Sequence, residues 1–88
     1  MNKTEKRKEI TKRFLTYITE QFPQYEICDD GDGGRMYFYL KGGDNDESIE
    51  YHRTNGLYAF NWATDLTKEN LAIMEDMLYT ITKKVEAM

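Results

Sequence analysis

The stretch SIEYHRTNGLYAFNW, residues 48–62, contains the clearest turn signal in the chain, the pair Asn55-Gly56. An Asn-Gly pair favours a two-residue type I′ turn, in which both central residues have a positive φ. A turn of this type pairs Thr54 with Leu57, and every second side chain then points to the same sheet surface. One surface carries the pairs Arg53–Tyr58, Tyr51–Phe60 and Ile49–Trp62, and the other carries His52–Ala59 and Glu50–Asn61. The stretch therefore predicts a hairpin with one aromatic surface and one polar surface.

The segment before this hairpin shows the period of two that is typical of a strand. Met36, Phe38 and Leu40 alternate with Tyr37 and Tyr39, so we expect the first three side chains in the core and the two tyrosines on the polar surface. Residues 25–28 are interpreted as an edge strand. Tyr37 and Tyr39 then share one sheet surface with Glu50, His52 and Asn61.

Two further segments have the apolar spacing of amphipathic helices. The first is predicted over residues 4–21, because Pro23 cannot continue a helix. Its apolar side is made of Ile10, Phe14, Leu15, Ile18 and Phe22. The second is predicted to have Thr67 as its N-cap and a hydrophobic staple between Leu66 and Leu71. Its apolar stripe is made of Leu71, Met74, Met77, Leu78, Ile81 and Val85.

These elements predict a single α+β domain over residues 1–88, in the order helix, three or four antiparallel strands, helix. The apolar side of each helix must be buried, and packing both helices on one face of the sheet gives a two-layer sandwich. The expected core packs Phe38, Tyr51, Phe60 and Trp62 against Phe14, Ile18, Leu78 and Ile81.

The composition limits the classes of partner. The chain has 88 residues, 12 Lys and Arg against 16 Asp and Glu, and a formal net charge of −4. Residues 24–50 hold eight acidic and two basic side chains, which disfavours direct binding of nucleic acid because phosphates are bound by Lys and Arg. A single cysteine favours a reducing compartment. No signal peptide or membrane span is recognisable, so we expect a cytoplasmic protein without membrane contact, as a monomer or small homo-oligomer.

Two acidic turns were considered as cation sites. Their residues are Asp29, Asp30 and Asp32 in the first turn and Asp44, Asp46 and Glu47 in the second. An EF-hand loop needs glycine at position six and a bidentate carboxylate at position twelve. Counting from Asp30 puts Lys41 at position twelve, and counting from Asp44 puts Ile49 and Asn55 at these two positions. We therefore expect solvated turns, with no metal and no cofactor.

Cys28, His52 and Asn61 occur in the order of a papain-type triad. A nucleophilic cysteine needs a helix N-terminus or a close imidazolium to lower its pKa, together with donors to an oxyanion. No motif in the chain supplies these groups, so we expect the protein not to be an enzyme.

The basic side of the first helix could contact nucleic acid or anionic lipid through Lys6, Arg7, Lys12 and Arg13. Glu5 and Glu9 dilute this charge. A helix surface of mixed charge is ordinarily solvated, and we prefer that interpretation.

The predicted order of elements also describes the double-stranded RNA-binding domain. That family has basic residues at the start of its second helix, where this chain has Thr67, Lys68, Glu69 and Asn70. One lysine does not supply the phosphate-binding chemistry. The likeness is therefore interpreted as shared topology, which does not imply shared function.

The function that we expect is a non-catalytic acidic interaction module that occupies a basic surface of a partner protein. Such a module would act as an inhibitor or regulator, and it is similar in size and charge to phage and mobile-element products that block host defence enzymes. The alternative is a small-ligand site or minor enzyme that uses Tyr37, Glu50 and His52. The expected partner-binding residues are Asp29, Asp30, Asp32, Tyr37, Tyr39, Asp44, Asp46, Glu47, Glu50, His52 and Asn61.

Overall fold

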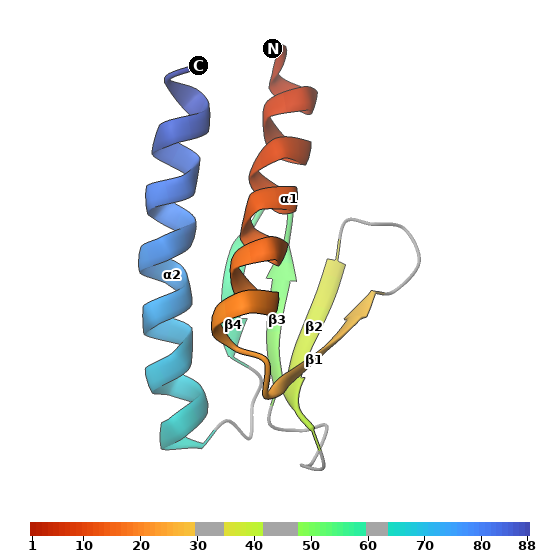
Figure 1. Ribbon diagram of the computed structural model, residues 1–88, viewed down its shortest axis with the longest axis vertical. Helices are drawn as coiled ribbons and strands as arrows, with labels where there is room; N and C mark the ends of the chain where they lie inside the picture. Colours follow the sequence, from red (N-terminus) through yellow and green to blue (C-terminus); the bar gives the residue numbers. More distant parts are fainter. Residues whose placement is uncertain (30–34, 42–47, 60–63) are drawn as a thin grey trace.

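The computed structural model describes residues 1–29, 35–41, 48–59 and 64–88. Four antiparallel strands form one sheet in the order β1-β2-β3-β4, and the two helices pack side by side on one of its faces (Figure 1). The elements are α1 Lys3–Gln21, β1 Tyr25–Asp29, β2 Arg35–Leu40, β3 Ser48–His52, β4 Gly56–Ala59 and α2 Asp65–Glu86. The predicted two-layer α+β fold is confirmed, and the sheet has four strands.

Helix α1 starts and ends where its terminal groups find partners. The side chain of Asn2 accepts a hydrogen bond from the Glu5 backbone N–H at 2.8 Å, which caps the first turn. The Phe22 N–H donates to the Ile18 carbonyl at 2.8 Å, and Pro23 follows. The predicted apolar side faces the core, with Phe14, Ile18 and Phe22 buried.

Helix α2 begins earlier than the sequence predicted, and the prediction of Thr67 as its N-cap is wrong. Thr64 is the N-cap, because its Oγ1 accepts from the Thr67 N–H at 3.2 Å. Thr67 is instead fully buried within the first turn. Starting the helix at Asp65 leaves Leu66 53% exposed, so the predicted staple does not form. The predicted stripe is confirmed: Met74, Ile81 and Val85 are buried, and Leu71, Met77 and Leu78 pack beside them.

The predicted register of the β3–β4 hairpin is also wrong. His52 pairs with Gly56 across a three-residue loop, Tyr51 pairs with Leu57, and Glu50 pairs with Tyr58. Among the described residues only Gly56 has a positive φ, of 89°. A type I′ turn would need a positive φ at Asn55 as well, whereas here only Gly56, the residue directly after the loop, has one, and glycine adopts it without strain.

The corrected register reverses the two surfaces of β4. Ile49 pairs with Ala59, so Leu57 and Ala59 share the helix-facing side of the sheet with Ile49 and Tyr51. Tyr58, which we expected on this aromatic side, lies on the opposite side beside Glu50. Residues 60–63 lie outside the described part of the chain, and with them the predicted positions of Phe60, Asn61 and Trp62.

The core joins both helices to the helix-facing side of the sheet. The ring of Phe14 lies with its centroid 6.1 Å from that of Phe38 and 5.4 Å from that of Tyr51. The predicted core residues Phe14, Ile18, Phe38, Tyr51 and Ile81 are buried, while Leu78 is partly buried at the edge of the cluster. Aromatic contact of this kind supplies a large part of the burial in a small domain.

Burial of Tyr51 makes the stability of the fold sensitive to alkaline pH. Its hydroxyl shares a hydrogen bond with that of Thr11 at 2.8 Å. Burial raises the pKa of Tyr51, although this hydrogen bond and the charge of Arg53 lower it in part. The phenol therefore loses its proton more readily in the unfolded chain than in the folded protein.

We expect the contribution of Tyr51 to stability to be complete below about pH 10 and to be lost as the pH rises through its folded-state pKa. Urea unfolding across this range measures the effect. Tyr51→Phe should reduce the alkaline loss of stability, and Tyr79→Phe, an exposed control on α2, should not. If the free energy of unfolding fell equally with rising pH in the two variants, the prediction would be contradicted.

Candidate functional site

The side of the sheet that faces away from both helices is called the outer sheet face below. It carries side chains from all four strands, because alternate residues of each paired strand point to the same side. Its members are Glu26, Cys28, Arg35, Tyr37, Tyr39, Ser48, Glu50, His52 and Tyr58. Tyr37, Tyr39, Glu50 and His52 therefore share one face, as their alternation predicted.

One row of this face crosses the whole sheet. Cys28 pairs with Tyr37, Tyr37 pairs with Glu50, and Glu50 pairs with Tyr58. Cross-strand neighbours lie about 4.5–5.5 Å apart at their Cβ atoms, so their side chains contact one another. The row places a carboxylate between two tyrosines on the sheet face that neither helix covers.

Glu50 organises the residues around it on the outer sheet face. It is only 3% exposed. Its Oε1 lies 2.7 Å from Nε2 of His52 and 3.1 Å from Nε of Arg35. Charge-assisted hydrogen bonds of this length are among the stronger polar contacts in proteins. The carboxylate therefore fixes an imidazole from its own strand and a guanidinium from β2.

Tyr58 completes this network from β4. Its hydroxyl lies 3.0 Å from Nε2 of His52, and the two rings stack with centroids 5.5 Å apart. A hydrogen bond to Glu50, followed by partial burial, raises the pKa of Tyr58, while the charge of Arg35 lowers it in part. The phenol thus stays neutral at physiological pH. The ring is 42% exposed, so it is held in place and still available to a partner.

Arg35 connects the network to Tyr37 on its own strand. A hydrogen bond with Tyr37 is the largest cause that raises the pKa of Arg35, and burial opposes it. The guanidinium is half-exposed and spans Tyr37 and Glu50. Together with Tyr58 it gives the face a pre-ordered surface of one aromatic ring and one guanidinium, whose charge is paired with Glu50.

The geometry separates the residues of the considered papain-type triad. Cys28 lies on β1 and His52 on β3, with β2 between them, which corresponds to about 10 Å at the usual strand spacing. Nε2 of His52 is already bonded to Glu50 and close to Tyr58. Cys28 is exposed, and it instead forms a hydrogen bond with Tyr39 that raises the pKa of that phenol, as does burial.

Arg35 and Tyr58 are site residues that the sequence analysis missed. Arg35 continues the alternation of Tyr37 and Tyr39, so the strand period could have placed it on this face. Tyr58 was assigned to the aromatic surface of the sheet because the predicted hairpin register was wrong. A register with a three-residue loop places Tyr58 beside Glu50 on the outer sheet face.

The acidic part of the predicted site is only partly described. Glu26 is exposed on the outer sheet face, and the backbone of Asp29 pairs with Met36 at the end of β1. Five predicted acidic residues and one amide lie outside the described residues: Asp30, Asp32, Asp44, Asp46, Glu47 and Asn61. Within residues 1–29, 35–41, 48–59 and 64–88, no group of three His, Cys, Asp or Glu side chains could hold a metal ion.

Comparison with known proteins gives no further guide. No family model matches the chain. No curated protein and no solved structure matches it either. In the described segments, neither helix combines the length and apolar character needed to cross a membrane. The function is therefore inferred from the geometry of the outer sheet face and from the distribution of charge.

Proposed function

We propose that the protein is a non-catalytic interaction module that binds a basic surface of a partner protein through its outer sheet face. The observation that carries the proposal is the Glu50 network, which holds Arg35 and Tyr58 in place on a face that neither helix covers. Tyrosine and arginine are enriched among the residues that dominate binding energy. Ordering them before binding reduces the entropy lost on association.

The expected sign of the partner follows from the charge on this face and from the sequence of the connections between its strands. Glu26 is exposed on it. The connection from β1 to β2 contains Asp30 and Asp32, and the connection from β2 to β3 contains Asp44, Asp46 and Glu47. Complementary charge speeds encounter and disfavours wrong partners. The proposal is therefore a partner with a basic surface, and the single cysteine fits a reducing, cytoplasmic setting.

Basic protein surfaces frequently serve to hold nucleic acid. A small acidic protein on such a surface would exclude the nucleic acid and act as an inhibitor or regulator. This is the mode that we propose, in the manner of the small acidic proteins that phages and mobile elements direct against host defence enzymes.

Affinity capture from a lysate of the native host tests the proposal, run at low and high salt and with nuclease treatment. We expect one basic nucleic-acid-binding protein, retained after nuclease and released by salt. A variant with Tyr37→Ala and Tyr58→Ala should lose this protein. Tyr79→Ala is the matched control, because Tyr79 is 65% exposed but lies on α2 in the other layer.

The charge contribution is tested separately. A variant with Asp44→Lys, Asp46→Lys and Glu47→Lys should bind the captured protein more weakly and with a smaller dependence on salt. Its melting temperature should change little, because the sequence predicts a solvated turn for these residues, and charges in such a turn contribute little to stability. Unchanged affinity in this variant, or nuclease-sensitive capture, would overturn the proposal.

The alternative function, a small-ligand site at Tyr37, Glu50 and His52, has less support. Glu50 and His52 already bond to each other. The recess beside Tyr37, lined also by Cys28, Tyr39 and Ser48, has a volume of about 200 Å³, whereas ligand pockets commonly measure ~300–1,000 Å³. A metabolite that raises the melting temperature of the wild type but not of His52→Ala would favour the alternative.

A further inference from the structure

One flank of helix α2 carries large apolar side chains that are exposed to solvent. Leu66 is 53% exposed and Ile73 is 49% exposed, while Met77 is partly buried at the edge of the core. Residues at i, i+7, i+11 and i+18 lie on one line along a helix, because a helix has about 3.6 residues per turn. Leu66, Ile73, Met77 and Lys84 therefore share one line, and these four residues are called the α2 flank below.

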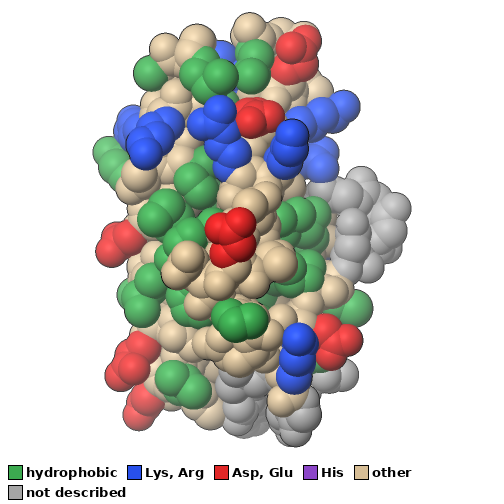
Figure 2. Space-filling model, viewed as in Figure 1, with side chains coloured by type: hydrophobic (Ala, Val, Ile, Leu, Met, Phe, Trp, Pro, Cys, Tyr) green, Lys and Arg blue, Asp and Glu red, His purple; other side chains and the backbone are tan. Residues whose placement is uncertain are grey.

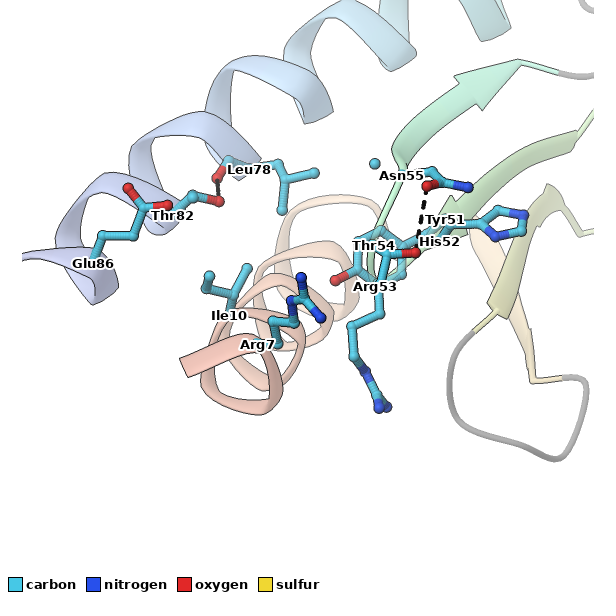
Figure 3. A pocket seen from close by; sticks show the side chains of 11 residues that line it. Arg7, Ile10, Tyr51, His52, Arg53, Thr54, Asn55, Leu78, Thr82 and Glu86 are labelled. Carbon is cyan, nitrogen blue, oxygen red and sulfur yellow. Dashed lines mark hydrogen bonds between the residues drawn. The ribbon is translucent and has the colours of Figure 1, made fainter. Parts of the chain in front are cut away.

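The α2 flank lies on the side of this helix that faces away from α1. Leu78 and Thr82 of α2 line one cavity together with Arg7 and Ile10 of α1 (Figure 3), so they mark the side of α2 next to α1. They lie about 120–160° around the helix axis from the α2 flank. Helix α2 is at one side of the molecule, and no other described helix or strand lies beyond it (Figure 1). A further helix can therefore approach this flank.

Charge is divided unequally along α2. Residues 65–76 hold four acidic side chains and one basic side chain, and residues 77–86 hold two basic and one acidic. Figure 2 shows red Asp and Glu side chains along the first half of α2, and blue Lys and Arg side chains over its second half and the adjacent start of α1. A two-fold axis across α2 places the first half of one copy against the second half of another. The charge pattern is thus complementary to itself in an antiparallel pair.

One antiparallel register satisfies both the apolar and the charged residues. When Ile73 meets Met77 of a second copy, the same register places Leu66 against Lys84 of that copy, whose methylene stem can cover an apolar side chain. Glu69 and Lys83 lie beside the α2 flank on one side of it. The register therefore brings Glu69 close to Lys83 of the second copy, and the two-fold axis repeats every contact.

Two features limit the strength of this pairing. Asp76 lies between Glu69 and Lys83 on the same side of the helix, and the two-fold axis places it near Asp76 of the second copy, where like charges repel. The contact is also restricted to one flank of a 22-residue helix, which buries less than the ~800 Å² per partner of a standard interface. The pair is therefore weak and reversible.

We propose that the protein forms a weak antiparallel dimer, in which a second copy of this chain covers the α2 flank. The self-complementary charge of α2 is what favours a second copy over another protein. The α2 flank belongs to the helix layer, so this proposal does not rest on the function proposed for the outer sheet face. At the low micromolar concentrations used for circular dichroism the chain is a monomer, and changes on the α2 flank leave its unfolding unaffected.

Sedimentation equilibrium of the full chain over a concentration series tests the proposal. We expect the wild type to be a monomer at low micromolar and a dimer at high micromolar concentration. Glu69→Lys and Lys83→Glu should each weaken self-association at least about fivefold, because each change is repeated across the two-fold axis. The variant that carries both changes should dimerise like the wild type, and a mixture of the two single variants should associate more strongly than either alone.

Matched variants separate this interface from a general effect of charge. Glu75→Lys makes the same change as Glu69→Lys at an exposed position on the opposite side of α2, and it should dimerise like the wild type. Asp76→Asn should strengthen the dimer, because it removes the repulsion at the axis. Circular dichroism melts check that each variant is folded.

Three results would overturn the proposal. They are a wild type that stays monomeric at about 1 mM, equal weakening by Glu75→Lys, and a variant with both Glu69→Lys and Lys83→Glu that does not regain dimerisation. If the wild type is monomeric and Glu69→Lys no longer binds the captured partner protein, the α2 flank belongs to that partner instead.

Discussion

Phe14→Ala is expected to lower the free energy of unfolding by about 3–5 kcal/mol, the largest effect of any single change considered. Phe14 is fully buried at the centre of the core. Its ring contacts Phe38 and Tyr51 from the sheet and Tyr17 from its own helix. Truncation removes these contacts and leaves a cavity that the surrounding side chains fill only in part.

Urea unfolding followed by circular dichroism measures this change. A small domain has only ~5–15 kcal/mol of stability in total, so the variant should unfold at a much lower urea concentration than the wild type. Ile73→Ala is the control, because Ile73 is an exposed apolar residue of α2, and it should change stability by less than about 0.5 kcal/mol. A loss below about 1 kcal/mol for Phe14→Ala would show that the sheet and helices pack differently.

Glu50→Gln is expected to have the second largest effect, a loss of about 1–3 kcal/mol. The carboxylate accepts from His52 and Arg35, and the neutral amide would weaken both contacts within a buried setting. The same change should lower the pKa of Tyr58, because the hydrogen bond to the Glu50 carboxylate is the largest cause that raises it.

The two consequences of Glu50→Gln are measured by urea unfolding and by the pH titration of ¹³C-labelled tyrosine rings. Glu26→Gln is the control, since Glu26 is an exposed carboxylate on the same sheet face. It should leave the stability and the Tyr58 titration unchanged. A Tyr58 pKa that stays the same in Glu50→Gln would contradict the network, whatever the change in stability.

The parts of the fold that the sequence predicted correctly are those in which one periodicity determines burial. The alternation of Met36 and Phe38 with Tyr37 and Tyr39 placed the residues of β2 on their correct sides, as far as these are described. The spacing of Met74, Ile81 and Val85 placed α2 in the same way. Such patterns depend only on which positions are apolar.

Errors arose where two local solutions compete. Thr64 and Thr67 can each cap α2, and only the packed position of Thr67 selects Thr64. Asn55-Gly56 suits a two-residue turn or a three-residue loop, and the two choices differ in whether Leu57 and Ala59 or Tyr58 face the helices. Both alternatives were decided by tertiary packing, which a local motif does not contain.

In the candidate site as well, the sequence predicted what strand alternation determines and missed what tertiary packing determines. Strand alternation brought Tyr37, Tyr39, Glu50 and His52 together on one face. Contact between Glu50 and Tyr58 depends on the register, and the separation of Cys28 from His52 depends on the order of the strands. These relations join residues distant along the chain, so they required the structure.

The most direct test of the proposed interface is the ratio of two affinities for the captured partner protein, measured for Tyr58→Ala and Tyr79→Ala. Both changes remove an exposed tyrosine ring, one from the outer sheet face and one from α2. We expect Tyr58→Ala to bind at least about tenfold more weakly than Tyr79→Ala. Equal affinities, or weaker binding by Tyr79→Ala, would contradict an interface on the outer sheet face.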